Sequence, residues 1–570
     1  MRYLGIVILI AIGVPSVANK SYTDYPQLRR FFPFGVYIAA ERIADWTNPG
    51  SPTHFGRPMI EPYRRDLEDM SRHYINLVAI ENTACIPVPI MKQMLAEGQR
   101  VGIFTWASEN ALPPDSEADA YAKSRISQFR TEKGLLVWSP WDEPYPENME
   151  KWLLWKKAFE TADPNHPVIA VTCGGPKGFE SYDVIQASDY YPIYVDNPDP
   201  WSVRPFVRRY IEATTKPNWF VVQAFQGEGR RLPTVAESRM MTYMALAEGV
   251  KGILYFIYDH LVTHYNYPVT PQWEDIGKLG RILRAVGPEL LDTQVDHEST
   301  LVKFEVEPNS DTRRPSDWPS GICSVLRSPQ GYAFVIVYNT STESPVKVML
   351  RSSLPHKISD LQFLVETNRD PTADHSIELT LKPGDGRIFL LDDGTHYKRI
   401  ISRVRSNLYM TERQILQAER DLAVRWDIKT ASLDSLIARS GRALEHGDSR
   451  KAVDLILESK SSLSKAECAH PDFVSARRAL EVARESLWEY DCALSKLRRD
   501  QPEQWSDSMK WALDGFISRF LELDHEFRQG SRSVKERAEK LVADILKESR
   551  QLHSSSNEYT TNDAIAALRR

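Results

Sequence analysis

The sequence MMTYMALAEGVKGILYF, residues 240–256, contains a helix pattern that is followed directly by a strand pattern. Met240, Met241 and Met244 recur at the spacing of one helix face, and Gly249 is typical of a helix end. Residues 253–256 form an apolar run of the kind found in strands that are buried on both faces. This order predicts one unit of a parallel sheet that is covered by helices.

The same alternation occurs eight times between about Phe32 and Leu291. Eight units over about 260 residues match the usual size of a (β/α)8 TIM barrel, which we predict for residues 30–295. A doubly wound sheet is disfavoured, because Gly227-Glu228-Gly229 lacks the third glycine of a phosphate-binding loop. The predicted strands are Phe34 to Ile38, Asn76 to Glu81, Val101 to Trp106, Leu135 to Trp141, Val168 to Cys173, Val184 to Tyr190, Trp219 to Phe225 and Gly252 to Tyr258. The predicted helices include Pro62 to His73, Pro87 to Glu97, Ala118 to Glu132, Asn148 to Thr161, Val203 to Ala213 and Val235 to Glu248.

The pattern changes after Leu291. Short strand-like runs separated by turn residues predict a small β-sandwich over residues 296–395. Apolar stripes at helical spacing then predict an α-helical domain of five or six helices over residues 396–558, and residues 559–570 are predicted to be a flexible tail. The sandwich strands are expected at Leu301 to Val306, Gly321 to Arg327, Tyr332 to Tyr338, Val346 to Leu350, Gln362 to Glu366, Ile377 to Leu381 and Gly386 to Leu391.

Composition limits the possible partners. The net charge of −6 gives no electrostatic reason to expect binding to nucleic acid, and a neutral ligand is compatible with this charge.

Residues 1–18, with Arg2 before an apolar run and Ser16-Val17-Ala18 after a proline, predict a signal peptide that is cleaved during export to a secreted, periplasmic or extracellular location. An uncleaved membrane anchor is the alternative, but the run is shorter than the roughly 20 residues that span a bilayer. No later segment predicts a membrane span, and the oligomeric state cannot be read from the sequence.

The five cysteines are scattered singly, so we expect the core rather than crosslinks to hold the fold together. Cys468 and Cys492 are the only pair that we consider for a disulfide.

The catalytic groups of a barrel come from the carboxyl ends of its strands, which makes the end of the fourth strand the most informative. It reads Trp138-Ser139-Pro140-Trp141-Asp142-Glu143-Pro144. Apolar neighbours raise the cost of ionising a carboxyl and can keep it protonated near neutral pH, so one of the two acids can serve as a general acid. A salt-bridged surface turn is the alternative, but the position at a strand end favours chemistry.

The stretch from Trp141 to Pro144, with Trp152 and Trp155 in the next helix, resembles the acid/base strand of barrel glycoside hydrolases over roughly the first half of the chain. The resemblance implies that Glu143 protonates the glycosidic oxygen. In the retaining clan A hydrolases an Asn usually precedes that Glu and a second Glu at strand seven is the nucleophile. This chain has Asp142 instead, and its seventh strand ends near Gln223 and Glu228.

Two routes therefore stay open. Glu228 can act as the nucleophile, although it lies on a glycine-flanked loop. Alternatively, the 2-acetamido group of the substrate attacks while Asp142 orients it, and the Asp-Glu-Pro motif is similar to that of β-N-acetylgalactosaminidase-type hexosaminidases. Gln223 would then only bind substrate.

Other strand ends carry the mixture of aromatic and polar side chains that lines saccharide clefts. Most aromatic residues must be core, so each is a candidate only. No serine-hydrolase elbow or zinc helix is present, His260 and His264 lack a third ligand, and we predict no metal and no cofactor. The leading interpretation is a glycoside hydrolase that acts on an oligo- or polysaccharide, and the alternatives are an inactive carbohydrate-binding barrel or a structural cell-surface protein. The candidate substrate-binding residues are Tyr37, Asn82, Trp106, Trp141, Asp189, Tyr191, Gln223 and Asp259.

Overall fold

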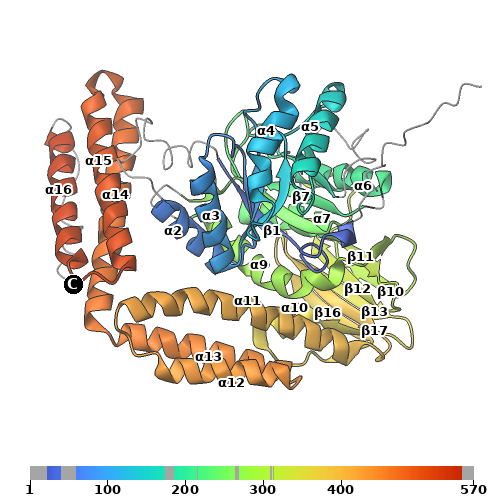
Figure 1. The fold of residues 1–570 in the computed structure, drawn as a ribbon. Coiled ribbons are helices and arrows are strands. Elements are labelled where there is room, and N and C mark those ends of the chain that lie inside the picture. Colours follow the sequence, from blue (N-terminus) through green and yellow to red (C-terminus); the bar gives the residue numbers. More distant parts are fainter. Residues whose placement is uncertain are drawn as a thin grey trace, which may run out of the picture.

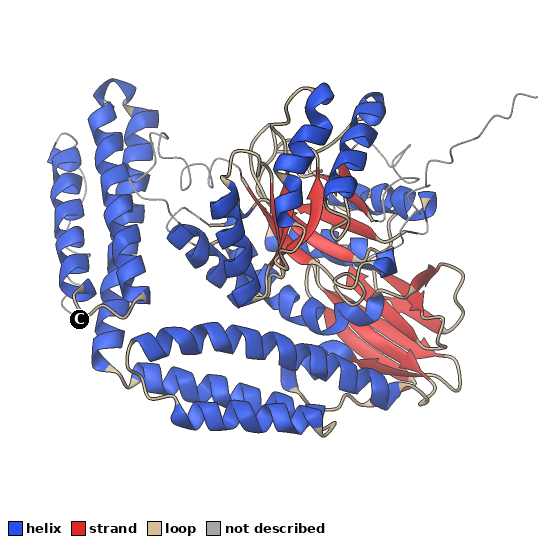
Figure 2. Cartoon of the chain, viewed as in Figure 1, coloured by secondary structure: helices blue, strands red, loops and turns tan. Residues whose placement is uncertain are grey.

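The computed structural model describes residues 22–39, 60–173, 185–214, 216–262, 269–308, 311 and 313–554. The predicted signal peptide, the predicted tail at 559–570 and His264 lie outside these ranges. The described chain forms an eight-stranded parallel sheet surrounded by helices, then antiparallel sheets, and then a region of long helices (Figures 1 and 2). The predicted fold class is thereby confirmed in outline.

The parallel sheet is a nearly closed barrel. Its strands are hydrogen-bonded in the order β4-β3-β2-β1-β8-β7-β6-β5. A single parallel bridge between Trp138 and Val168 joins the β4 end of this order to the chain that enters β5. The strands are β1 (Phe34–Ile38), β2 (Leu77–Ile80), β3 (Phe104–Ser108), β4 (Leu135–Ser139), β5 (Ala170–Thr172), β6 (Gln186–Tyr190), β7 (Asn218–Gln223) and β8 (Gly252–Phe256). Each lies within or beside its predicted run.

Large side chains fill the interior of the barrel. The Trp106 ring lies 5.7 Å from Tyr37 and 6.1 Å from Trp219, measured between ring centroids. All three belong to one buried cluster together with Leu77 and Leu254. Because the strands are buried on both faces, their sequences read as continuous apolar runs, which is why they could be predicted.

Helices cover the outside of the barrel. Thr234 begins α7 with a capping box, in which its side chain accepts a hydrogen bond from the Glu237 backbone and the Glu237 side chain accepts one from the Thr234 backbone. The helices are α2 (Ile60–Arg72), α3 (Val88–Val101), α4 (Ala118–Ser124), α5 (Met149–Ala162), α6 (Val203–Ala213), α7 (Val235–Ala247), α8 (Tyr258–Leu261) and α9 (Pro271–Leu290). Short 3-10 turns occur at η1 (Tyr22–Asp24), η2 (Asp115–Glu117), η3 (Ile126–Phe129), η4 (Pro146–Asn148) and η6 (Pro200–Ser202).

Two antiparallel sheets follow the barrel and pack face to face over a shared apolar cluster that includes Val335, Leu350 and Phe389. One sheet has the order β10-β13-β16 and the other β15-β14-β17-β12-β11-β9. The strands are β9 (Gln294–Asp296), β10 (Val302–Val306), β11 (Gly321–Arg327), β12 (Ala333–Asn339), β13 (Val346–Ser352), β14 (Lys357–Asp360), β15 (Ala373–Asp374), β16 (Ser376–Leu381) and β17 (Gly386–Asp392).

One predicted strand of this part is wrong. Residues 362–366 belong to the helix α10 (Leu361–Thr367). The Asp360 side chain accepts hydrogen bonds from the backbone of Gln362 and Phe363, and this cap starts the helix. Leu361, Leu364 and Val365 are buried at helical spacing, a pattern that the short apolar run did not distinguish from a strand.

The long helices form two groups (Figure 1). The helix α11 packs along α9 and also contacts α2 and α3, so it lies against the barrel. The helix α13 packs on α11 and on α12, while α14, α15 and α16 pack together. The bounds are α11 (Tyr397–Arg425), α12 (Ala431–Glu445), α13 (Ser449–Cys468), α14 (Pro471–Asp500), η7 (Pro502–Gln504), α15 (Asp507–Arg528) and α16 (Val534–Ser554).

All five cysteines are free thiols, so the disulfide considered between Cys468 and Cys492 is wrong. Among the described residues, no helix combines the length and the apolar character needed to cross a membrane.

Candidate active site

The acidic pair predicted at the fourth strand lies in a turn immediately after β4. Glu143 has a φ of 45°, which is in the left-handed region and is unusual for a residue with a side chain. The Asp142 backbone N–H donates to Asn110 Oδ1 at 2.8 Å, and Ser139 Oγ donates to the Trp141 carbonyl at 2.7 Å. These two hydrogen bonds fix the turn. Residues with a strained backbone, such as Glu143, cluster at functional sites.

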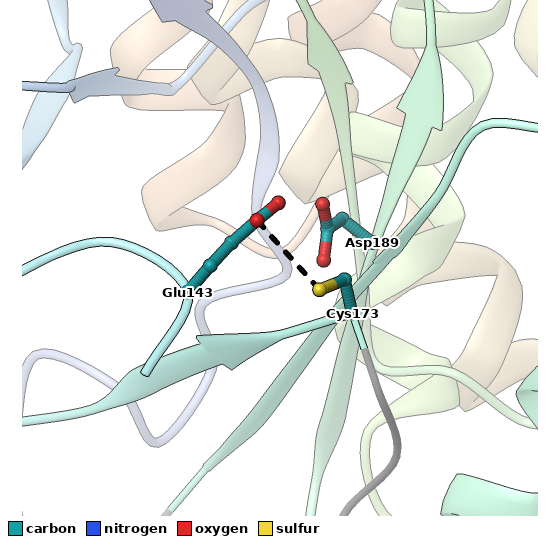
Figure 3. Close-up of side chains that lie close together, drawn as sticks. All are labelled: Glu143, Cys173 and Asp189. Carbon is teal, nitrogen blue, oxygen red and sulfur yellow. Dashed lines mark hydrogen bonds between the residues drawn. The ribbon is translucent and has the colours of Figure 1, made fainter. Parts of the chain in front are cut away.

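Three neighbouring strand ends bring Glu143, Cys173 and Asp189 together (Figure 3). One carboxyl oxygen of Glu143, one of Asp189 and Cys173 Sγ all lie within 4.8 Å of one another. Cys173 Sγ, directly after β5, donates a weak hydrogen bond to Glu143 Oε2 at 3.6 Å. Asp189 belongs to β6 and is 2% exposed, whereas Glu143 is half-buried. The cluster therefore pairs a buried acid with a more accessible one.

Burial and mutual repulsion shift the ionisation of this cluster. Burial, followed by the nearby Glu143 and Asp142, raises the pKa of Asp189 well above its usual range. Burial raises the pKa of Asp142 to about 7, and Glu143 and Glu81 add to that shift. Burial, followed by the nearby Glu143 and Asp189, raises the pKa of the Cys173 thiol to about 12. Because neighbouring carboxyls resist ionising together, at least one proton stays in the cluster near neutral pH.

Aromatic residues surround the acids. Tyr37, at the end of β1, has its pKa raised by burial and then by Asp142, Asp189 and Glu143, so its hydroxyl lies among these carboxyls and remains protonated. Burial and Asp189 raise the pKa of Tyr191 in the same way.

Several polar atoms in this region are buried without a hydrogen-bond partner in the described structure. Buried polar atoms are rarely left unpaired, so unpaired ones at a strand-end cluster are available to a bound molecule. They are the Tyr37 hydroxyl, Trp106 Nε1, Asp142 Oδ1 and Asp189 Oδ1.

A second buried acid stabilises the neighbouring loops. Glu109, directly after β3, accepts hydrogen bonds from Thr83 Oγ1 at 2.5 Å and from Arg125 Nε at 2.7 Å, and also from the Tyr121 hydroxyl. Arg125 in turn donates to the backbone carbonyls of Thr83 and Ile86. The β2 and β3 ends are thereby held rigidly beside the acidic turn.

Glu228 lies outside the cluster. Its side chain is 83% exposed and forms an ion pair with Arg230 at 3.3 Å. Gln223 is fully buried, and its amide bonds the backbone of Ile193, Phe225 and Arg231. Its hydrogen bonds connect the loops after β6 and β7.

The remaining predicted residues occupy structural positions. Asn82 Oδ1 accepts from the Ala84 backbone within a turn, and Asp259 Oδ2 accepts from the Ala39 backbone at 3.0 Å. The half-buried Trp141 ring lies 5.7 Å from Lys151 Nζ in a cation–π contact. The structure therefore brings Asp142, Glu143, Asp189, Tyr37, Trp106 and Tyr191 to one region, whereas Asn82, Trp141, Gln223, Asp259 and Glu228 contact other groups.

Cys173 is the member of the cluster that the sequence did not single out. Its position at the predicted end of the fifth strand was the available signal. A thiol with two carboxyls is also a set of donors that a divalent cation can bind, but the expectation that no metal takes part in catalysis stays a prediction.

No protein-family model matches this chain, and a search of curated proteins found no match. Among solved structures, the chain is similar to a glycoside hydrolase family 5 protein from Bacteroides vulgatus, with a TM-score of 0.43 and 12% identity over 59% of this chain and 87% of that one. A protein described as a glycoside hydrolase matches with a TM-score of 0.42 and 12% identity, over 64% of this chain and 93% of that one. A family 27 β-L-arabinopyranosidase from Geobacillus stearothermophilus matches with a TM-score of 0.37 and 12% identity, over 59% of this chain and 93% of that one. Similarities this distant support no conclusion about activity, so we argue function from the geometry of the site.

Proposed function

We propose that the chain is a glycoside hydrolase whose two reacting carboxyls are Glu143 and Asp189. The observation that carries the proposal is that one carboxyl oxygen of each residue lies within 4.8 Å of the other, at the carboxyl ends of β4 and β6, the two strands on either side of β5. In glycosidases that retain stereochemistry the two carboxyls lie about 5–5.5 Å apart, whereas inverting enzymes need about 6.5–9.5 Å to admit a water molecule. The short separation favours the retaining, double-displacement route.

The two acids then have different tasks. Asp189, kept protonated by burial and by its neighbours, donates its proton to the glycosidic oxygen as the bond to the sugar carbon breaks. The Glu143 carboxylate attacks that carbon and forms a glycosyl-enzyme. Asp189, now ionised, removes a proton from water, which attacks the same carbon and releases Glu143. This assignment makes Glu143 the nucleophile rather than the general acid that the sequence predicted.

Asp142 supports a second candidate route. Its Oδ1 is buried without a partner, and a protonated or ionised carboxyl there can orient a 2-acetamido group that performs the attack itself. In that case Asp142 and Glu143 act as the pair, which is one of the two routes that the sequence left open, and Asp189 binds substrate.

Aryl glycosides with and without a 2-acetamido group distinguish the two routes. On the double-displacement route, Glu143→Gln and Asp189→Asn each lower kcat/KM by about 10²–10⁴-fold, and Asp142→Asn lowers it less. On the substrate-assisted route, only acetamido substrates react, and Asp142→Asn is as damaging as Glu143→Gln. Glu147→Gln, an exposed acid on η4, is the matched control, and Glu228→Gln tests the nucleophile that the sequence offered.

Full activity in both Glu143→Gln and Asp189→Asn would refute the mechanism. Saccharide binding without turnover in the unmodified protein would instead favour the carbohydrate-binding barrel. Export through the predicted signal peptide is part of the proposal and is supported by residues 1–18 of the sequence alone. Mass spectrometry of the protein recovered from the culture medium tests it, because cleavage after Ala18 gives a mature chain that begins at Asn19.

A further inference from the structure

A cavity of about 350 Å³ lies at the end of the barrel opposite the acidic cluster. Phe32, Asn76 and Gly102 line it, and each precedes one of the strands β1, β2 and β3. On the other side it is lined by α9 and by α11, the long helix that lies against the barrel (Figure 1). The amino face of a barrel normally serves stability, so a cavity of ligand size there needs an explanation.

The charged side chains that line this cavity are both arginines, Arg30 and Arg284, although the chain as a whole has a net charge of −6. Arg30 forms an ion pair with Glu289, which also pairs with Arg403 at 3.4 Å. Arg284 has no such partner: among the described residues no carboxylate forms an ion pair with it, and its hydrogen bonds go through Nη1 to the carbonyls of Tyr74 and Ile75 at 3.1 and 3.4 Å.

Arg284 is partly buried, and no opposite charge lies beside its guanidinium among the described residues. Burial lowers the pKa of Arg284 to about 10, and the nearby Tyr74 opposes that change only in part. Removing a charge from water is unfavourable unless an opposite charge replaces the water. Arginine also binds planar anions through two parallel hydrogen bonds, and one of its nitrogens is already held by the backbone here.

The other walls of the cavity suit an organic ligand. Phe31 and Phe104 both line the cavity, and their rings pack edge to face with 5.2 Å between the ring centroids. The side chain of Gln414 in α11 packs directly on Gly102: a Cβ atom added to Gly102 would lie 1.8 Å from Gln414 Nε2. The barrel and α11 therefore form the walls together, with aromatic and amide groups beside the two cations.

We propose that this cavity binds a small organic anion, with a carboxylate or phosphate on Arg284 and an apolar part against Phe31 and Phe104. Such a ligand contacts both the barrel and α11, so it stabilises their association. The site is separate from the acidic cluster and does not depend on the proposed glycosidase activity.

Calorimetric titration of the full chain tests the proposal with benzoate as the probe, benzyl alcohol as its neutral counterpart and inorganic phosphate as an anion without an apolar part. We expect one benzoate per chain, at least tenfold weaker binding of both other probes, and a rise in the Tm with benzoate. Arg284→Met should weaken benzoate binding at least tenfold, and Arg284→Lys should weaken it less.

A second pair of variants addresses the same point without removing the arginine. Met410→Trp places a bulky ring at the cavity from an exposed position of α11 and should abolish benzoate binding, whereas Val424→Trp, at an exposed position of the same helix away from the cavity, should not. Equal binding of benzyl alcohol, or unchanged benzoate binding in both Arg284→Met and Met410→Trp, would overturn the proposal.

Discussion

At the scale of single residues, the buried carboxyl of Asp142 makes stability depend on pH. Its pKa is about 7 in the folded chain, mainly because of burial, against about 3.9 in an unfolded chain. Between pH 4 and 7 the folded state binds a proton that the unfolded state has lost, so Asp142 destabilises the fold increasingly as the pH rises through this window. The full penalty above pH 7 is at most about 4 kcal/mol.

Asp142→Asn should therefore raise the free energy of unfolding at pH 8 and leave it nearly unchanged at pH 4. Urea denaturation at intervals between these values measures the difference. Asp189 is shifted in the same direction, so the variant should retain part of the slope. A variant that is less stable than the parent chain at pH 8 would contradict the assignment.

The Cys173 thiol gives a second prediction at this scale. Because its pKa is raised to about 12, it should be almost fully protonated at pH 8, and the thiolate is the reactive form. Iodoacetamide should modify Cys173 at least 100-fold more slowly than the exposed Cys468 in the folded chain. Peptide mass spectrometry over time measures both rates, and denaturation should make them similar. Equal rates before denaturation would contradict the arrangement around Glu143.

The sequence located the acidic turn and offered Asp189 only as a substrate-binding residue, and it did not single out Cys173. Asp142 and Glu143 were found because they are adjacent in the chain and follow a recognisable strand. Asp189 and Cys173 come from two other strand ends, and only the closed barrel brings them beside Glu143. Glu228 was a candidate from its place after the seventh strand, but a sequence does not determine whether a loop side chain points inward or into solvent.

At the scale of secondary-structure elements, most segments could be predicted from their apolar pattern, but the short segment at 362–366 could not. The eight parallel strands read as continuous apolar runs, and the long terminal helices have enough apolar residues for their helical period to be clear. The segment at 362–366 is too short for that, and its identity as α10 depends on the Asp360 cap and on packing against β17 and α9.

This cap can be tested directly. Asp360→Ala removes the acceptor for the Gln362 and Phe363 backbone N–H groups, at 2.9 and 3.0 Å, and should destabilise the fold by about 1 kcal/mol. Asp360→Asn keeps an acceptor and should cost less. Thermal and urea unfolding followed by circular dichroism gives both values, and equal losses in the two variants would show that the charge rather than the cap matters.

At the scale of the whole molecule, a buried ion network joins the long helices to the barrel. Glu412 of α11 accepts from Arg281 of α9 at 2.8 Å, from Lys460 of α13 at 2.7 Å and from the Tyr74 hydroxyl at 3.1 Å. Burial alone would raise the pKa of Glu412, but the two cations outweigh it and hold the pKa below its usual value. One carboxylate thus connects the barrel, α11 and α13, in addition to the apolar contacts between α9 and α11.

Removing the Glu412 carboxylate should loosen the packing of α11 on α9 and α13, because it leaves the charges of Arg281 and Lys460 without an opposite charge. Glu412→Gln keeps the size of the side chain and should destabilise the fold by about 3–5 kcal/mol. Glu419→Gln on the same helix is the control: its contact with Arg72 is 3.9 Å long and partly exposed, so its loss should cost less than about 1 kcal/mol. Hydrogen exchange should locate the Glu412→Gln effect at α9, α11 and α13 and leave β1 to β8 protected. If exchange rises equally throughout the barrel, the long helices are instead part of its cooperative folding unit, and they cannot loosen without unfolding the acidic cluster as well.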